Sequence, residues 1–180
     1  MAYVAADGPP DIDATHAWAP ATGTAPPVLN DQARGATGPA TLPWVRIASI
    51  DGWRDLPEID DRRAPKTVGD GEIDYPSRTL GKTVVYVCQV RGQTKEQTRG
   101  RLSAIIAGYG LSLSAKGTMT VTPYAAVGGP AWTFQARTLA IDSDSAWTYV
   151  AGGWGPYRWG FTLSLRMSDP RFYTGGVGYL

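Results

Sequence analysis

The chain has 180 residues, and its 17 lysine and arginine side chains nearly balance its 16 aspartate and glutamate side chains. The length suits one ordinary domain with an appended arm, and the charge balance disfavours strong nonspecific attraction to nucleic acid or to an anionic membrane. Glycine (22 residues), proline (14) and tryptophan (7) are plentiful, which favours a turn-rich β protein over a helical bundle.

The N-terminal segment, residues 1–43, is rich in proline and alanine and has almost no periodic apolar pattern. It predicts an arm, because it offers too little apolar surface to offset the entropy lost on ordering. Two interpretations stay open: a disordered leader, and a segment that lies on a neighbouring subunit through anchors at Trp18, Val28 and Leu29. No basic region precedes an apolar run and no stretch of about 18 apolar residues occurs, so we expect a soluble product without an export signal.

The folded domain is predicted over residues 44–174, and residues 175–180 are left as a short C-terminal tail. A strand at Trp44–Ile50 runs into the Asp51-Gly52 turn signal. The polar run over residues 54–78 is broken by three prolines and two glycines. It predicts a long loop or an exposed hairpin around a Gly-Asp-Gly tip.

Four longer strands are expected in the rest of the chain. The β-branched and aromatic run Thr83–Val90 predicts a central strand, and Cys88 within it is most simply a small buried hydrophobe. Alternating patterns over residues 118–124, 131–144 and 157–167 predict three more strands.

One helix is predicted directly after the strand that ends near Gly92. Thr94 and Gln97 form a capping box, in which the hydroxyl can accept a hydrogen bond from an amide of the first turn. Gly108 and Gly110 supply the end of the helix. One apolar stripe is formed at positions i, i+3, i+4 and i+7 by Leu102, Ile105, Ile106 and Tyr109.

The last long strand ends abruptly. Its apolar residues repeat at every second position, which predicts one buried face made of Phe161, Leu163, Leu165 and Met167. Asp169-Pro170 then ends the strand, because proline lacks the N–H that a ladder needs and restricts the residue before it. The chain must turn there and deliver Arg171, Phe172 and Tyr173 elsewhere.

The inventory of reactive side chains is poor. His16 is the one histidine and Cys88 the one cysteine, so neither a zinc cluster nor a Cys/His or Ser/His/Asp arrangement can be assembled, and no phosphate-binding glycine motif occurs. We therefore predict no catalytic residue, no cofactor and no metal, and expect a protein that is not an enzyme.

Acidic residues cluster at Glu58, Asp60 and Asp61, at Asp70, Glu72 and Asp74, and around Asp142 and Asp144. Paired carboxylates could serve a glycosidase or bind calcium. Their position among prolines and glycines favours solvated loop side chains instead.

The tryptophans suggest a competing function. Carbohydrate-binding β-sandwiches stack sugars on exposed aromatic rings, and the segment from Ala151 to Gly160 is rich in glycine and tryptophan. The alternative function is therefore a monomeric carbohydrate-binding module. The interpretation that we favour is a core or subunit-interface role, because large aromatic side chains dominate both, for Trp132, Trp147, Trp154 and Trp159.

Taken in order, these elements resemble the distal tail proteins of long-tailed, siphovirus-type bacteriophages, often grouped with minor tail proteins. The likeness covers about residues 44–173. It rests on Arg78 after a glycine-containing loop, on the Gly92-Gln93-Thr94 step from strand to helix, and on the closing Asp169-Pro170-Arg171-Phe172-Tyr173. The resemblance implies an α+β, mainly β fold: an antiparallel β-sandwich or split barrel with one flanking α-helix, related to phage tail-tube folds.

The resemblance also implies a function in the virion. Six copies would form a ring at the distal end of the tail, assembled in the host cytoplasm, between the tail-tube protein and the tail-tip, hub or tape-measure proteins. DNA would pass through the ring without sequence-specific binding, and no membrane partner is expected. A tail-tube subunit is the alternative within this interpretation.

Two groups of residues follow as candidates. Acidic residues on the channel wall would keep DNA from adhering, and the candidates are Asp70, Glu72 and Asp74. Candidate interface residues from the motifs and from the tryptophan-rich segment are Arg78, Thr94, Trp154, Trp159, Asp169, Pro170, Phe172 and Tyr173.

Overall fold

The computed structural model describes most of the chain. The described residues are 12–31, 43–55, 57, 59–60, 63–65, 72–74, 78–110, 115–124, 128–144, 146, 148–151, 155–175 and 177–179.

The described part contains one helix, α1 (Lys95–Gly110), and is otherwise built from strands. The strands are β1 (Ala14–Ala19), β2 (Trp44–Asp51), β3 (Ile59–Asp60), β4 (Arg63–Pro65), β5 (Glu72–Asp74), β6 (Arg78–Thr79), β7 (Lys82–Gly92), β8 (Gly117–Pro123), β9 (Trp132–Ser143), β10 (Thr148–Tyr149), β11 (Tyr157–Met167), β12 (Phe172–Thr174) and β13 (Val177–Tyr179).

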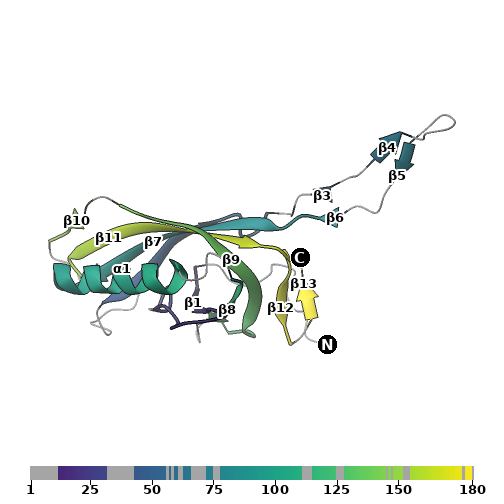
Figure 1. The fold of residues 1–180 in the computed structure, drawn as a ribbon. Coiled ribbons are helices and arrows are strands. Elements are labelled where there is room, and N and C mark those ends of the chain that lie inside the picture. Colours follow the sequence, from purple (N-terminus) through teal and green to yellow (C-terminus); the bar gives the residue numbers. More distant parts are fainter. Residues whose placement is uncertain are drawn as a thin grey trace.

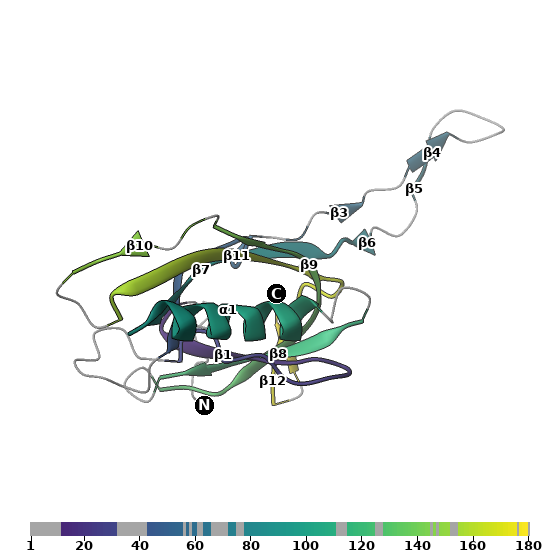
Figure 2. The same cartoon turned by 60° about the vertical axis from the view of Figure 1, so that its left-hand side comes forward.

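The main sheet is antiparallel and has the order β1-β8-β9-β11-β7-β2. Strand β9 belongs to two layers, because residues 132–136 pair with β8 and residues 137–143 pair with β11. Strand β12 joins the first half of β9, and β13 pairs with β12. Helix α1 lies between the two layers along one side (Figures 1 and 2). The predicted α+β, mainly β class with antiparallel strands and one helix is confirmed.

The core lies between the layers. Alternate residues of β7 face inward, and Cys88 is among them with 2% of its surface exposed, as predicted. The predicted face of the last long strand is also confirmed, since all four of its members are buried: Phe161, Leu163, Leu165 and Met167.

The helix begins as its sequence predicts. The Gln97 backbone N–H donates to the Thr94 hydroxyl at 3.2 Å, and the Gln97 side chain accepts from the Gln93 N–H at 3.2 Å. The predicted apolar stripe is wrong at Ile106, which is 41% exposed. The buried face is rotated toward the N-terminal segment, because Gly108 lies against Pro26 with no room for a side chain between them.

The prediction of an arm does not hold for residues 12–31. Strand β1 pairs with β8 along its whole length, and its inward residues Ala14, His16 and Trp18 are buried. The Trp18 ring stacks on Tyr109 of α1, with 5.5 Å between ring centroids. Residues 177–179, predicted as part of a tail, likewise form β13. The hydrogen bonds and contacts of strand pairing offset the entropy that these segments lose on ordering. Their local composition did not indicate this pairing.

Two adjacent side chains join this N-terminal segment to the far end of the sheet. The Asn30 side chain donates to the carbonyls of Ile12 at 2.6 Å and Ala14 at 2.9 Å, and it accepts from the Ile47 N–H at 3.4 Å. The Asp31 carboxylate accepts from the Val45 N–H at 3.0 Å. We call these two residues the Asn30–Asp31 junction. It satisfies amides on the outer edge of β2, which would otherwise be an open edge.

Asn30 also has a left-handed backbone conformation, with φ of 57°. Replacing Asn30 with alanine is expected to cost about 2–3 kcal/mol of unfolding free energy, because buried carbonyl and amide groups lose their partner. Asn30→Gly loses the same hydrogen bonds without the left-handed strain, so it should be about 1 kcal/mol less harmful. Urea unfolding measures both, and an alanine variant as stable as the original chain would contradict the role of the junction.

Candidate functional site

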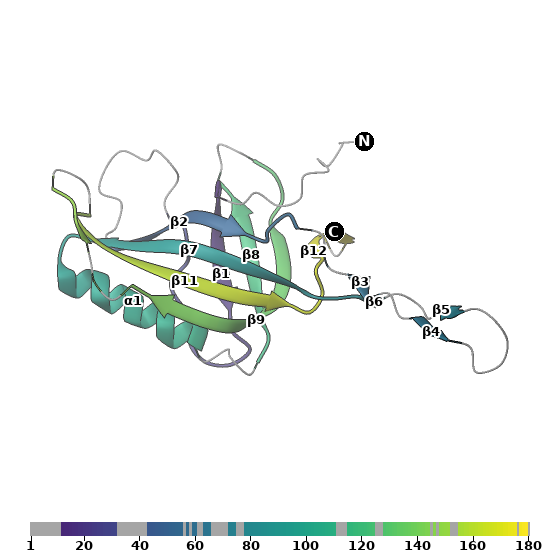
Figure 3. The same ribbon diagram turned by 90° about the horizontal axis from the view of Figure 1, so that it is seen from above.

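The segment between β2 and β7 forms a hairpin that leaves the body of the protein (Figures 1 and 3). Two short antiparallel ladders build it: β3 with β6 over two residue pairs, and β4 with β5 over three. We call residues 54–81 the hairpin arm. Of the two alternatives predicted for residues 54–78, a long loop and an exposed hairpin, the described ladders support the hairpin. Its Gly-Asp-Gly tip, including Asp70, lies outside the described residues.

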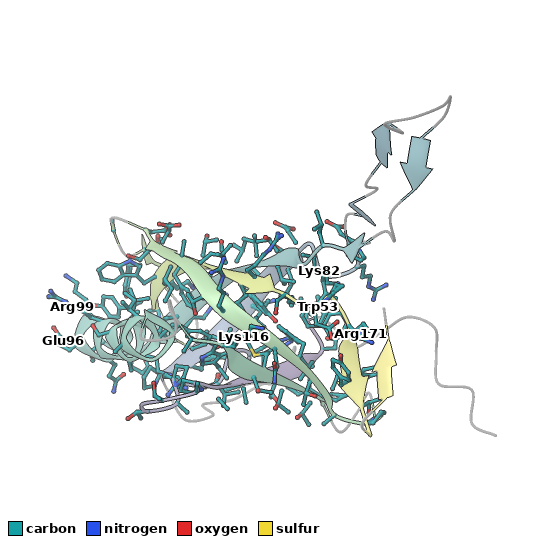
Figure 4. All side chains as sticks on the ribbon, turned by 45° about the vertical axis from the view of Figure 1, so that its right-hand side comes forward. Trp53, Lys82, Glu96, Arg99, Lys116 and Arg171 are labelled. Atoms are coloured by element: carbon teal, nitrogen blue, oxygen red, sulfur yellow. The ribbon has the colours of Figure 1, made fainter. Side chains whose placement is uncertain are left out.

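The hairpin arm is fastened where its two legs meet the body. Lys82 begins β7 and donates through Nζ to the backbone carbonyl of Trp53 at 2.9 Å. The same ammonium lies 4.6 Å from the centroid of the Phe172 ring. Both Trp53 and Lys82 are buried, below the base of the arm in Figure 4. Burial lowers the pKa of Lys82, and the nearby Asp55 opposes that shift. We call Trp53, Lys82 and Phe172 the arm root.

Glycine is required in both legs next to the root. Gly52 has φ of 74°, and a Cβ there would collide with the Thr83 carbonyl. A Cβ at Gly81 would collide with the Met167 carbonyl. The two chain segments at the base of the arm therefore contact β7 and β11 directly. These contacts determine the direction in which the arm projects from the body of the protein.

The closing Asp-Pro motif completes the root. The Asp169 carboxylate accepts from the Arg171 backbone N–H at 3.1 Å and from its guanidinium at 2.7 and 2.8 Å, and also from the Tyr173 hydroxyl. These bonds hold the turn after β11. They hold the pKa of Asp169 well below its usual range, mainly through the hydrogen bonds from Arg171. Pro170 is buried in the same turn.

The turn after β11 places the aromatic ring of Phe172 in the core. Phe172 lies 4.9 Å from Trp53 and 5.4 Å from Phe134, measured between ring centroids. In the described part of the chain, the motif therefore supports the base of the hairpin arm from within. This is why a strand that ends at Asp-Pro is followed at once by two aromatic residues.

The structure separates the candidate interface residues into groups. It brings Asp169, Pro170, Phe172 and Tyr173 together, with Pro170 and Phe172 in the interior. Thr94 instead caps α1. Arg78, Glu72 and Asp74 lie in the ladders of the arm, where the backbone alone is described.

Of the four tryptophans that suggested a sugar platform, two can be placed. Trp132 is buried in the core, with 4% exposure. Trp159 is partly buried, and its indole N–H donates to the Asp144 carbonyl at 2.8 Å. Trp147 and Trp154 lie outside the described residues. The placed rings therefore do not form an exposed pair.

A hollow of about 320 Å³ beside the Asp-Pro turn is lined by Thr118, Thr133, Phe134, Gln135, Asp169 and Tyr173. Among the described residues, no three histidine, cysteine, aspartate or glutamate side chains gather closely enough to hold a metal ion. Within the same residues, no helix has the length and apolar character needed to span a membrane.

The sequence did not indicate the role of Trp53 and Lys82, the two members of the arm root that lie outside the Asp-Pro motif. A lysine at the start of a strand is typical of an exposed charge, so Lys82 gave no sign of its burial. Trp53 follows a turn signal and precedes a polar run, and nothing nearby indicates that its ring packs under Phe172, 119 positions later in the sequence.

No family model matches the chain, and no curated protein matches it either. Among solved structures, it is similar to the crystal structure of the Dit (gp 19.1) protein of phage SPP1, described there as a paradigm of the hub adsorption apparatus in phages that infect Gram-positive bacteria. The TM-score is 0.49 and the sequence identity 16%, over 72% of this chain and 46% of the Dit chain. The chain thus spans about half the length of that protein.

Phe172→Ala should reduce the unfolding free energy by about 3–5 kcal/mol, because it leaves a cavity under the arm root. Tyr173→Phe is the matched control, since it keeps a ring at the neighbouring position and loses only the hydrogen bond to Asp169, so it should cost about 1 kcal/mol. Chemical unfolding followed by tryptophan fluorescence measures both. Equal effects of the two substitutions would contradict the placement of Phe172 as the anchor.

The Asp169 turn should be sensitive to acid. A carboxyl whose pKa is lowered by folding stabilises the folded state above its unfolded pKa of about 3.8, and this contribution is lost as the pH falls below that value. Asp169→Asn should therefore destabilise the protein at pH 6 by about 1 kcal/mol or less, because the ion pair is partly exposed and screened. The difference between variant and original chain should shrink at pH 3. A constant difference at both pH values in urea unfolding would rule out this linkage.

Proposed function

We propose that this chain is a structural subunit of a bacteriophage tail, and specifically a distal tail subunit whose six copies form a ring between tail tube and tail tip. The order of its sequence motifs supports this proposal, together with the antiparallel two-layer fold and its single helix. The observation that carries it is the hairpin arm, which is buried and hydrogen-bonded at its base and whose described residues beyond the base form only two short ladders.

The physics of the arm favours an intermolecular role. Ladders of two and three residue pairs do not make a stable free hairpin, and a two-stranded ribbon needs a further surface to pack against. The root, by contrast, is buried and hydrogen-bonded. A segment that is fixed at its base, and whose described residues beyond it are held by two short ladders, is suited to lie on a neighbouring subunit.

The chain also carries a sheet edge that could receive a neighbour. In the described part, residues 137–143 of β9 pair only with β11, and Leu139 on this stretch is 42% exposed. Contact between an arm and a different surface of the next copy is heterologous, and such contacts close into a ring when the rotation fits. Strand edges of this kind are natural sites for intermolecular pairing.

In this proposal the ring joins unlike partners on its two faces, the tail-tube protein on one and tail-tip, hub or tape-measure proteins on the other. DNA passes through the opening without sequence-specific binding. The acidic residues Glu72 and Asp74 lie in the hairpin arm, so a channel-lining role for them requires that the arm point inward. The protein then resides in the virion.

Native mass measurement tests the proposal. The full chain should form a discrete hexamer, and replacing residues 55–80 by a short Gly-Ser linker should yield a monomer that circular dichroism shows to be folded. Leu139→Asp, which keeps the arm and blocks the β9 edge, is a second variant expected to weaken assembly. Deleting residues 1–42 is unsuitable, because it removes β1 from the core. A full chain that stays monomeric at every concentration, or an arm deletion that leaves a hexamer intact, would refute the arm-mediated ring.

A further inference from the structure

Three arginines meet on the outer face of the sheet, at the end opposite the hairpin arm. The register places Trp44 of β2 opposite Arg91 of β7, and Arg91 opposite Arg158 of β11. Arg46 lies two positions along β2. Directly opposed residues of antiparallel strands share a face, so these side chains form one continuous surface. We call Trp44, Arg46, Arg91 and Arg158 the arginine surface.

None of the three arginines of this surface forms an ion pair within the described part of the chain. The ion pairs found there join Arg101 to Asp31 and Arg171 to Asp169, and none involves the arginine surface. Arg91 donates through Nε to the Gln89 side chain at 2.9 Å, and its guanidinium lies 5.4 Å from the Trp44 ring. Burial lowers the pKa of Arg91 to about 10, with Arg158 and Arg46 adding to the effect by like-charge repulsion.

Two hydrogen-bond donors on the same surface are buried and have no partner among the described residues. They are the indole Nε1 of Trp44 and the Nε of Arg158. A buried donor without an acceptor costs free energy, and so does a cluster of like charges. The surface is thus incomplete in the isolated chain, and a group that supplies both negative charge and acceptor oxygens would complete it.

Carboxylate and phosphate oxygens meet these requirements, because a guanidinium fork donates two parallel hydrogen bonds to either. The neighbouring residues disfavour a nucleic acid backbone. A side chain at Gly160 would collide with the Asp144 carboxylate, so this acid lies over the same face two positions from Arg158. Asp142 follows, opposite Thr162. A nucleic acid backbone needs an extended run of cations, and here the run is interrupted by acids.

We propose that the arginine surface is a docking site for a short acidic segment of a protein partner, whose aspartate or glutamate carboxylates bind between the three guanidinium groups. The overall charge of the chain supports a local rather than a general attraction, since 17 basic residues balance 16 acidic ones. This inference goes beyond the ring proposed above and does not depend on it, because it concerns a different face of the protein.

The proposal has an unusual consequence for stability. Arg91→Gln removes a like charge from the cluster, so it should leave the thermal midpoint of the isolated chain unchanged or higher while it weakens binding. Residues that lower stability on their own but bind a partner are expected at functional sites. A loss of binding without a loss of stability is therefore the expected signature.

Isothermal titration of the full chain with a blocked hexaglutamate peptide tests the site. We expect Arg91→Gln and Arg158→Gln each to weaken binding about tenfold or more, since each removes a charged hydrogen-bond partner. Arg166→Gln is the matched control, because it removes the same charge from the same face of β11 at its other end, next to Thr83. Its affinity should stay within about twofold of the original.

Other outcomes are equally decisive. Equal losses in all three variants would show a general charge effect and overturn the proposal. Absence of peptide binding by the original chain would also overturn it, as would tighter binding of a hexathymidine oligonucleotide that is lost in the same variants. If Arg158→Gln does not fold, Trp44→Phe replaces it, since that substitution removes only the indole donor and should weaken binding without removing charge.

Discussion

The closure of the fold depends on the hydrogen bonds of the Asn30–Asp31 junction. Strands β1 and β2 stand at opposite ends of the order β1-β8-β9-β11-β7-β2, and no ladder joins them in the described part. The side chains of Asn30 and Asp31 bridge this gap, with Asn30 reaching the carbonyls beside β1 and both residues reaching amides of β2. Asp31 also binds Arg101 of α1 at 2.6 Å. In the described part of the chain, side chains thus bridge the two ends of the strand order, where a ladder is missing.

Much of the fold could be predicted from local patterns. The strands at β2, β7, β8, β9 and β11 follow from alternation and β-branched runs, and the start of α1 follows from its capping box. Strand β1 was not predicted. Its inward residues are Ala14, His16 and Trp18. Their spacing has the period of a strand, but a small side chain and a histidine in a proline-rich context do not identify a buried face. In the structure His16 is buried in the core, and its Nδ1 atom lies 3.2 Å from the Tyr86 hydroxyl.

The candidate site was less predictable than the fold, because its parts meet only in three dimensions. The Asp-Pro motif correctly indicated where β11 ends, but the destination of Phe172 depends on Trp53 and Lys82, which belong to distant segments. The arginine surface depends on the register of three strands, which alternation alone does not determine. Residues that carry a charge or an aromatic ring can be found in a sequence. Which of them become neighbours depends on how the strands pair in the sheet.

The attachment of the hairpin arm determines how the protein bears load. The arm continues roughly along β7 and joins β2 and β7 at the same end of the sheet (Figures 1 and 3). A pull on the arm along this direction drags β7 lengthwise past β11, to which it is paired over eleven residue positions. Force then acts on all bonds of that ladder together rather than opening them one after another. The longest ladder in the described part of the chain is therefore oriented to resist tension.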